Sequence, residues 1–184
     1  SVLGEGQPMY QRGAEQNVAQ LRREPSSNRR PQPLTTEDFT PENKALIRDT
    51  VAAIKEVAPG ADIQPFKTIE GGHARGGFFK GPLFGKFIGF ALETVDGKNY
   101  GAAETGRHEA IHWLKDTGLF RANEWEALER AANENKWFDK HGIDKRYPEL
   151  TELKKTEEAI AEEFAKGRPT RFKGYPQLIR RAFL

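Results

Sequence analysis

Residues 108–112 read His-Glu-Ala-Ile-His, and their spacing constrains the fold more than any other feature of the chain. Residues four apart lie on the same face of an α-helix, so His108 and His112 can direct both imidazoles at one metal ion. Glu109 follows His108 directly and lies close enough to act as a general base on water at that ion. The spacing therefore predicts a helix over about residues 105–116 that carries a metal centre on one face.

The third ligand must come from elsewhere in the chain. There is no cysteine, so histidines and carboxylates must hold the metal. H-E-x-x-H on a helix indicates Zn²⁺, and catalytic zinc usually takes three protein ligands. Glu158 and Glu162 share a face of the helix predicted over residues 150–166, so Glu158 would bind the metal while Glu162 accepts a hydrogen bond from a ligating histidine. The opposite assignment, with Glu162 as ligand, stays open, and the plain alternative is that both glutamates form a solvated acidic face.

Hydrophobic periodicity predicts an α+β fold, in which a small antiparallel or mixed sheet packs on the motif helix and on further helices. Thr40 and Pro41 form an N-cap and first turn that begin a helix. The six glycines of residues 71–85 predict a loop. The apolar run that follows predicts a strand closed by a turn at Asp96-Gly97. The expected helices are residues 41–58, 105–116, 122–135 and 150–166, and the expected strands are residues 61–69, 86–94 and 100–103.

Composition divides the chain into three segments. Residues 1–35 are rich in Gln, Arg, Pro, Ser and Gly without sustained apolar periodicity, which predicts a flexible linker or arm before the fold. Residues 36–168 hold the expected helices and strands and form the folded domain. Residues 169–184 predict a basic C-terminal helix that leads into a further domain.

Charge is distributed unevenly along the chain. The net charge is only +2, but residues 1–34 carry +2, residues 166–184 carry +6 and the acidic middle carries −6. Basic segments can bind nucleic-acid phosphates. A solvated or interdomain role is the simpler interpretation of the C-terminal cluster, which consists of Arg171, Lys173, Arg180 and Arg181.

The H-E-x-x-H helix followed by a helix of the form E-x-x-A-E-x-F-A resembles the gluzincin branch of the zincin metallopeptidases. Residues 104–165, roughly a third of the chain, are similar to the zincin-like peptidase domain of the large polyvalent proteins of phages and conjugative plasmids. The shared motifs are His108-Glu109-Ala110-Ile111-His112, Gly118-Leu119-Phe120, Glu124-Trp125, Leu128-Glu129-Arg130-Ala131-Ala132, Arg146-Tyr147-Pro148 and Glu158-Ala159-Ile160-Ala161-Glu162.

This resemblance implies a zincin-like metallopeptidase domain at residues 36–168, within a larger phage or mobile-element protein. It implies that His108, His112 and Glu158 bind Zn²⁺ and that Glu109 is the catalytic base in peptide-bond hydrolysis. Glu162 stands where Asp or Asn is common, which leaves its assignment against Glu158 open. The expected substrate is a peptide or protein, or the chain itself.

Peptide hydrolysis also needs a hydrogen-bond donor for the oxyanion. Tyr147 and His141 are candidates, although packing in a turn and in a loop explains each of them as well. The strand at Phe87–Glu93 could be a sheet edge that pairs with an extended substrate, but its apolar residues are better interpreted as core. His73, in the glycine-rich segment, is expected at the surface.

The sequence lacks the segments that span a membrane or direct a protein to secretion. No run approaches the roughly 20 apolar residues that span a bilayer, and residues 1–9 lack the regions of a secretory signal. We expect a protein that does not bind membranes and is cytoplasmic or delivered with phage or conjugative DNA.

The alternative functions are a non-catalytic binding module stabilised by zinc and a nucleic-acid-associated module that uses the basic ends. Glu109 favours the peptidase, because a purely structural metal needs no base.

Overall fold

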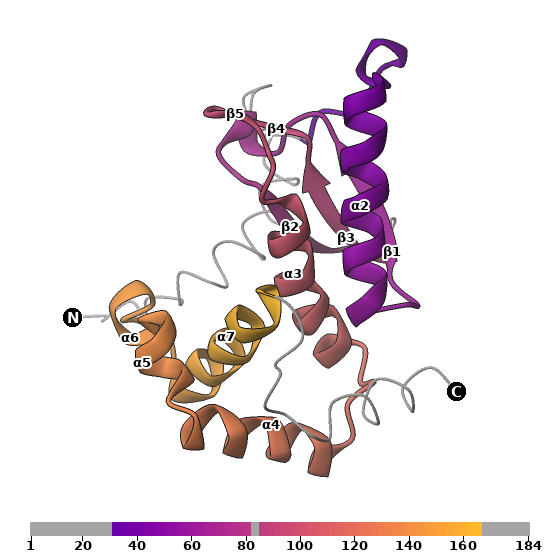
Figure 1. Cartoon of the computed structure of the whole chain (residues 1–184). Coiled ribbons are helices and arrows are strands. Elements are labelled where there is room, and N and C mark those ends of the chain that lie inside the picture. The colour runs from indigo at the N-terminus through magenta and orange to yellow at the C-terminus, as the bar shows by residue number, and fades with distance from the viewer. Residues whose placement is uncertain (1–30, 82–84, 167–184) are drawn as a thin grey trace, which may run out of the picture.

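The computed structural model describes residues 31–81 and 85–166. These residues form an α+β fold, as predicted, in which a small mixed sheet packs against helices (Figure 1). The sheet has the strand order β1-β3-β2, with β1 parallel and β2 antiparallel to the central β3. The helices are α2 Pro41–Val57, α3 Ala102–Asp116, α4 Ala122–Glu134, α5 Trp137–His141, α6 Ile143–Arg146 and α7 Glu152–Ala165, with 3-10 turns η1 Thr36–Asp38 and η2 Glu70–Gly72. The strands are β1 Asp62–Phe66, β2 Gly76–Gly81, β3 Gly85–Ala91, β4 Glu93–Thr94 and β5 Gly97–Lys98.

Helix α2 begins where the sequence predicts. Thr40 is the N-cap, and its hydroxyl accepts a hydrogen bond from the backbone N–H of Asn43 at 3.2 Å. Pro41 occupies the first helical position, where no backbone N–H is needed. The buried face of this helix includes Ile54 and Val57, which join the main hydrophobic core. Local capping and periodicity thus determine α2.

The prediction was wrong for the glycine-rich segment, which contains strand β2. Glycine weakens a strand locally, so three glycines in Gly76–Gly81 indicated a loop. Antiparallel pairing with β3 overrides that preference, and Phe78 and Phe79 alternate between the two faces of the sheet. A Cβ atom at Gly76 would lie 2.8 Å from the carbonyl oxygen of Gly89 and 2.9 Å from Cγ2 of Thr105. The missing side chain therefore lets α3 lie directly against β2.

Other local predictions also differ from the structure. Residues 100–103 are not a strand, because α3 already begins at Ala102 and Tyr100 is exposed, with its hydroxyl donating to Glu42 at 2.9 Å. The expected helices left residues 136–149 without one, but the structure has the short helices α5 and α6 there. The predicted turn at Asp96-Gly97 lies one residue earlier: Val95 and Asp96 join β4 to β5, and Gly97 already pairs with Thr94.

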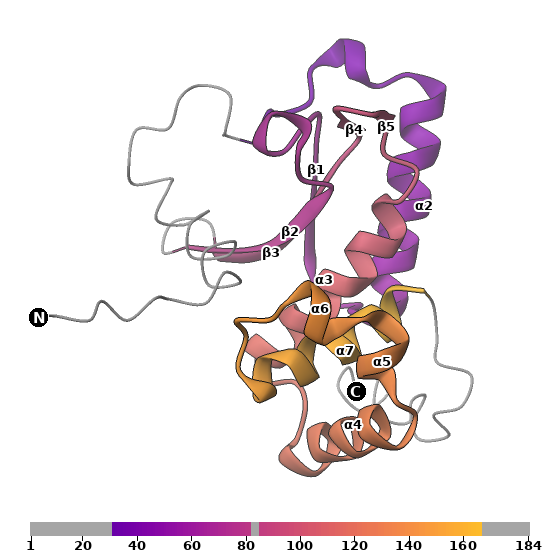
Figure 2. The same cartoon turned by 90° about the vertical axis from the view of Figure 1, so that its left-hand side faces the viewer.

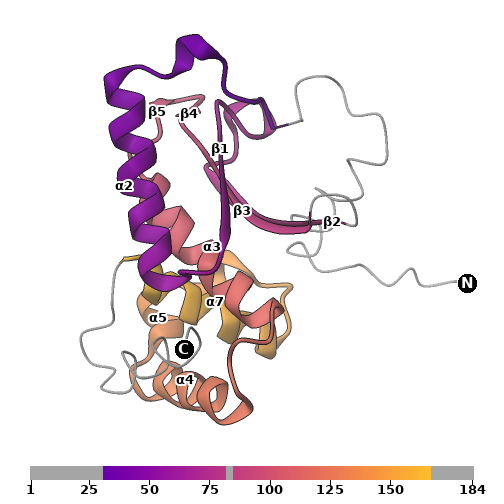
Figure 3. The same ribbon diagram turned by 90° about the vertical axis from the view of Figure 1, so that its right-hand side faces the viewer.

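Helix α3 lies at the centre of the molecule. Figures 2 and 3 show α2 and the sheet on one side of it and helices α4 to α7 on the other. It contacts α2, β2, β3 and α7. Buried Ala110, Ile111 and Leu114 on α3 join the same core as Ile88 of β3 and Phe164 of α7. Side chains on α3 therefore lie at the boundary between the sheet and helices α4 to α7.

Some predicted segments lie outside the described residues. They are the arm within residues 1–30 and the C-terminal helix with its basic residues Arg171, Lys173, Arg180 and Arg181. The division of the chain into arm, domain and C-terminal helix stays a prediction. Within residues 31–81 and 85–166, no helix is long and apolar enough to cross a membrane.

Candidate metal centre

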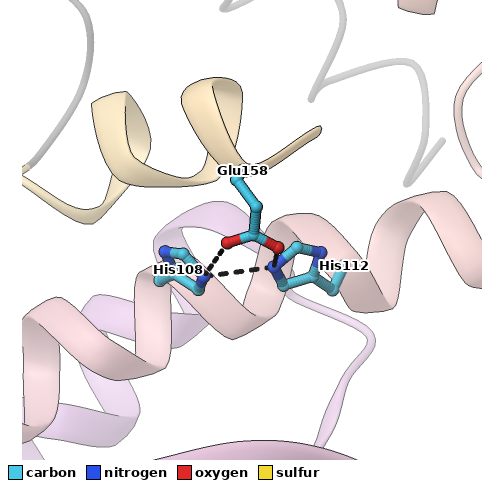
Figure 4. Close-up of side chains that lie close together, drawn as sticks. All are labelled: His108, His112 and Glu158. Atoms are coloured by element: carbon cyan, nitrogen blue, oxygen red, sulfur yellow. Dashed lines mark hydrogen bonds and ion pairs between the residues drawn. The ribbon is translucent and has the colours of Figure 1, made fainter. Parts of the chain in front are cut away.

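Close packing of α3 on α2 positions the two histidines of the motif. A Cβ atom at Gly106 would lie 2.5 Å from both Cγ1 and Cδ1 of Ile54, so α2 approaches α3 where there is no side chain. His108 and His112 follow on the face that turns toward α7 (Figure 4). The His108 side chain is 13% exposed and that of His112 only 3%. The helix therefore presents one histidine at the rim of the core and one inside it.

Glu158 of α7 completes a group of three side chains between the helices. Figure 4 shows its carboxylate pointing at both imidazoles. The Nε2 atoms of His108 and His112 lie 3.1 Å apart. Oε2 of Glu158 lies 3.4 Å from Nε2 of His108, and Oε1 lies 3.4 Å from Nε2 of His112. The structure thus brings together three residues that are 4 to 50 positions apart in sequence.

The geometry and burial of this group fit a metal ion. Ligand atoms about 2.0 Å from a tetrahedral ion lie about 3.3 Å from one another, close to the three separations observed here. The Glu158 side chain is fully buried, and neither of its oxygens has a hydrogen-bond donor within the described residues. A buried carboxylate without donors is costly unless a cation neutralises it. Two imidazoles and one carboxylate are a donor set that suits zinc.

The electrostatics of the group also favour a cation. Burial opposes a charge on His108, but the carboxylates of Glu158, Glu109 and Glu162 outweigh it and raise the pKa of His108 to about 9. Burial likewise opposes ionisation of Glu158, yet His112 and His108 lower the pKa of this carboxyl. In the metal-free protein Glu158 is therefore ionised, and His108 carries the extra proton. A metal ion would take the place of that proton.

Glu109 lies at the meeting point of α3 and the sheet. Its Oε2 accepts a hydrogen bond from the backbone N–H of Phe78 at 2.9 Å. Strand β2 is at the edge of the sheet, and Phe78 uses this N–H on the side away from β3. Glu109 also lines a cleft of about 310 Å³, together with His108, Tyr147, Arg146 and Arg75. The carboxylate predicted as general base therefore lies beside the one histidine of the group that reaches the cleft.

Tyr147, one of the two predicted oxyanion donors, lines the same cleft. Burial and the charge of Glu158 raise the pKa of Tyr147 to about 12, so its hydroxyl stays protonated. Nη2 of Arg146 donates to the Tyr147 oxygen at 3.2 Å and forms an ion pair with Oε1 of Glu162 at 2.7 Å. That same Glu162 oxygen lies 3.8 Å from Nδ1 of His108, too far for a hydrogen bond. Glu162 thus faces the back of His108 and binds Arg146 directly.

His141, the other predicted oxyanion donor, is not among the residues that line the cleft. It is buried on α5, and its Nε2 lies 2.8 Å from Oε2 of Glu163 on α7. The structure therefore does not bring His141 together with the group of three. His73 is exposed, as predicted.

Sequence reasoning missed Glu157 as a member of the site. This carboxylate is 4% exposed, and its Oε1 accepts from Nδ1 of His112 at 2.8 Å. Burial opposes its ionisation, but His112 and Lys115 hold its pKa well below the usual range. The available signal was its place directly before Glu158. That position alone does not show that it would reach the far nitrogen of a histidine.

In the part of the chain that the structure describes, His108, His112 and Glu158 form a buried group on two helices that could hold a metal ion. Glu109, next to His108, lines the adjoining cleft. No protein-family model, curated protein or solved structure matches the chain.

Proposed function

We propose that the chain is a zinc-dependent metallopeptidase of the gluzincin type, in which His108, His112 and Glu158 bind Zn²⁺. The observation that carries this proposal is the position of Glu109, whose carboxylate lies next to His108 in the cleft and accepts from Phe78. A metal that only stabilised the fold would need no base at an accessible face. The likeness of residues 104–165 to the peptidase domains of phage and plasmid polyvalent proteins points the same way. It suggests a part of a larger mobile-element protein, cytoplasmic or delivered with DNA.

Each residue of the cleft has a separate role in the proposed hydrolysis. Zinc, when bound, supplies a Lewis acid that polarises a carbonyl and acidifies water. Glu109 removes the proton of the attacking water and delivers it to the leaving amine. The Tyr147 hydroxyl, which stays protonated, donates a hydrogen bond to the oxyanion. Arg146 holds Glu162 behind His108.

The substrate is a peptide or protein in extended form, the chain itself included. The predicted docking strand, Phe87–Glu93, corresponds mainly to central strand β3, whose two neighbours leave it no edge. Its interpretation as core is confirmed, since Ile88 and Phe90 are fully buried. Edge strand β2 is the better candidate for pairing with an extended chain. The Phe78 N–H on that edge already donates to Glu109, so a peptide paired with the other backbone groups of β2 would lie beside this carboxylate.

The test compares wild type with Glu109→Gln after both have been loaded with zinc. We expect the variant to retain zinc, because Glu109 is not a ligand, and to lose cleavage of an unfolded protein such as reduced casein. Self-cleavage is followed in the same samples by mass spectrometry. Equal cleavage by both proteins would contradict the proposal. Zinc binding without cleavage in wild type would favour the non-catalytic binding module.

A further inference from the structure

Glu157 accepts three hydrogen bonds that occupy both of its carboxylate oxygens. Oε1 accepts from Nδ1 of His112 at 2.8 Å. Oε2 accepts from Nζ of Lys115 at 2.8 Å and from Nζ of Lys154 at 3.1 Å. Charge-assisted hydrogen bonds of this length are the strong ones. A buried carboxylate with all these partners has little freedom to turn away from the histidine.

The partners of Glu157 come from both sides of the helix interface. Lys115 is three residues after His112 on α3, whereas Lys154 precedes Glu157 by three residues on α7. The ammonium group of Lys115 also lies 4.2 Å from the centre of the Trp125 ring on α4. This cation–π contact fixes the lysine from a third helix. Glu157 is thereby held in place from α3 and α7, with support from α4.

The two histidines of the group differ in whether Nδ1 has a hydrogen-bond partner. His112 has a hydrogen bond of 2.8 Å at Nδ1, whereas Nδ1 of His108 has its nearest carboxylate oxygen, on Glu162, at 3.8 Å. In a neutral imidazole one nitrogen donates and the other accepts. An acceptor at Nδ1 therefore puts the proton of His112 there and leaves the Nε2 lone pair facing Glu158 and His108. His108 has no such direct constraint.

We propose that Glu157, held by Lys115 and Lys154, is the positioning residue of the metal centre: it fixes His112 as the Nδ1–H tautomer before the metal arrives. This inference rests on one part of the proposed function, namely that His108, His112 and Glu158 bind a metal ion. The two lysines keep the Glu157 carboxylate directed at His112. His108, which has no hydrogen bond at Nδ1 to any described residue, is the ligand that changes its orientation when the metal binds. Partners of this kind usually change metal affinity about 10- to 100-fold.

The experiment compares Glu157→Ala with Glu163→Ala. Glu163 is a matched control, because it lies on the same helix and contacts a lysine and a histidine, Lys140 and His141, away from the metal centre. Zinc affinity is measured by competition with a chromophoric chelator. The tautomer of His112 is measured in the metal-free proteins by long-range ¹H–¹⁵N correlation.

We expect Glu157→Ala to weaken zinc binding about 10- to 100-fold and to lose the Nδ1–H tautomer of His112, while Glu163→Ala changes neither. Glu157→Gln keeps the shape of the side chain and an acceptor oxygen. It should retain the tautomer and bind zinc with an affinity between those of wild type and Glu157→Ala. Wild-type zinc affinity in both Glu157 variants, or a wild-type His112 protonated at Nε2, would overturn the inference. Neither readout is peptidase activity, so a protein that binds zinc without cleaving peptides fails the proposed function and leaves this test intact.

Discussion

The Nε2 atoms of His108 and His112 face each other at 3.1 Å, and each has an oxygen of Glu158 3.4 Å away. Two imidazole lone pairs and a carboxylate repel one another at such distances unless a cation lies among them. In the metal-free protein a proton on His108 supplies that charge, because Glu158, Glu109 and Glu162 outweigh burial and raise the pKa of His108 to about 9. A metal ion satisfies all three groups at once.

Zinc binding should therefore release a proton at pH 7. The pKa of His108 lies above its ordinary value of 6.5, so the imidazole is charged at pH 7 in the metal-free protein and must lose its proton to become a ligand. We expect zinc affinity to rise about tenfold per pH unit between pH 7 and pH 9 and to level off above that range. Calorimetry in two buffers of different protonation enthalpy measures the proton release. A binding enthalpy independent of the buffer would contradict this expectation.

Glu158→Gln and Glu162→Gln distinguish the two candidate ligands on α7. Glu158 lies between the imidazoles, whereas Oε1 of Glu162 faces Nδ1 of His108 at 3.8 Å and binds Arg146. We expect Glu158→Gln to weaken zinc binding more than about 100-fold, since it removes one of three ligands. Glu162→Gln should bind one zinc ion with a smaller loss. The reverse ranking in an equilibrium titration would make Glu162 the ligand.

Tyr147→Phe tests the oxyanion donor. The change removes only the hydroxyl, so zinc content should stay the same while kcat falls about 10²- to 10³-fold with little change in KM. His141→Gln is the comparison, because His141 contacts Glu163 and does not line the cleft. That variant should keep its kcat when assayed below its melting temperature. A larger loss of kcat in His141→Gln than in Tyr147→Phe would reverse the two roles.

Gly106→Ala tests how α2 supports the motif helix. The new methyl group would lie 2.5 Å from two atoms of Ile54, which is itself fully buried, so the two helices must move apart. We expect a loss of about 1–3 kcal/mol in the free energy of unfolding, measured by denaturant titration. Gly81→Ala is the control, since a Cβ atom there would have no neighbour within 4 Å and Gly81 has no positive φ. Equal stability of the two variants would argue against close packing of α2 on α3.

The sequence predicted those parts of the fold and site that depend on local spacing. Helix α3 and the shared face of His108 and His112 follow from residues four apart, and α2 follows from its cap at Thr40. Strand β2 was missed because its glycines disfavour a strand locally, and only pairing with β3 supplies its hydrogen bonds. Local pattern could not show that α3 packs on its Gly76.

The roles of individual glutamates on α7 depend on how that helix docks against α3. Glu157, Glu158 and Glu162 are alike in a sequence, and their different partners are set by the contact between the two helices. The same applies to the oxyanion candidates. Tyr147 and His141 are six residues apart, but the turns around α6 bring one to the cleft and bury the other against Glu163.

The most direct measurement of the central claim is the zinc content of the whole chain after loading and dialysis, with wild type compared with His112→Ala and Glu109→Gln. The metal centre described here requires one zinc ion per chain in wild type and in Glu109→Gln and none in His112→Ala. A wild-type chain that retains no zinc, or a His112→Ala variant that retains as much as wild type, would contradict it.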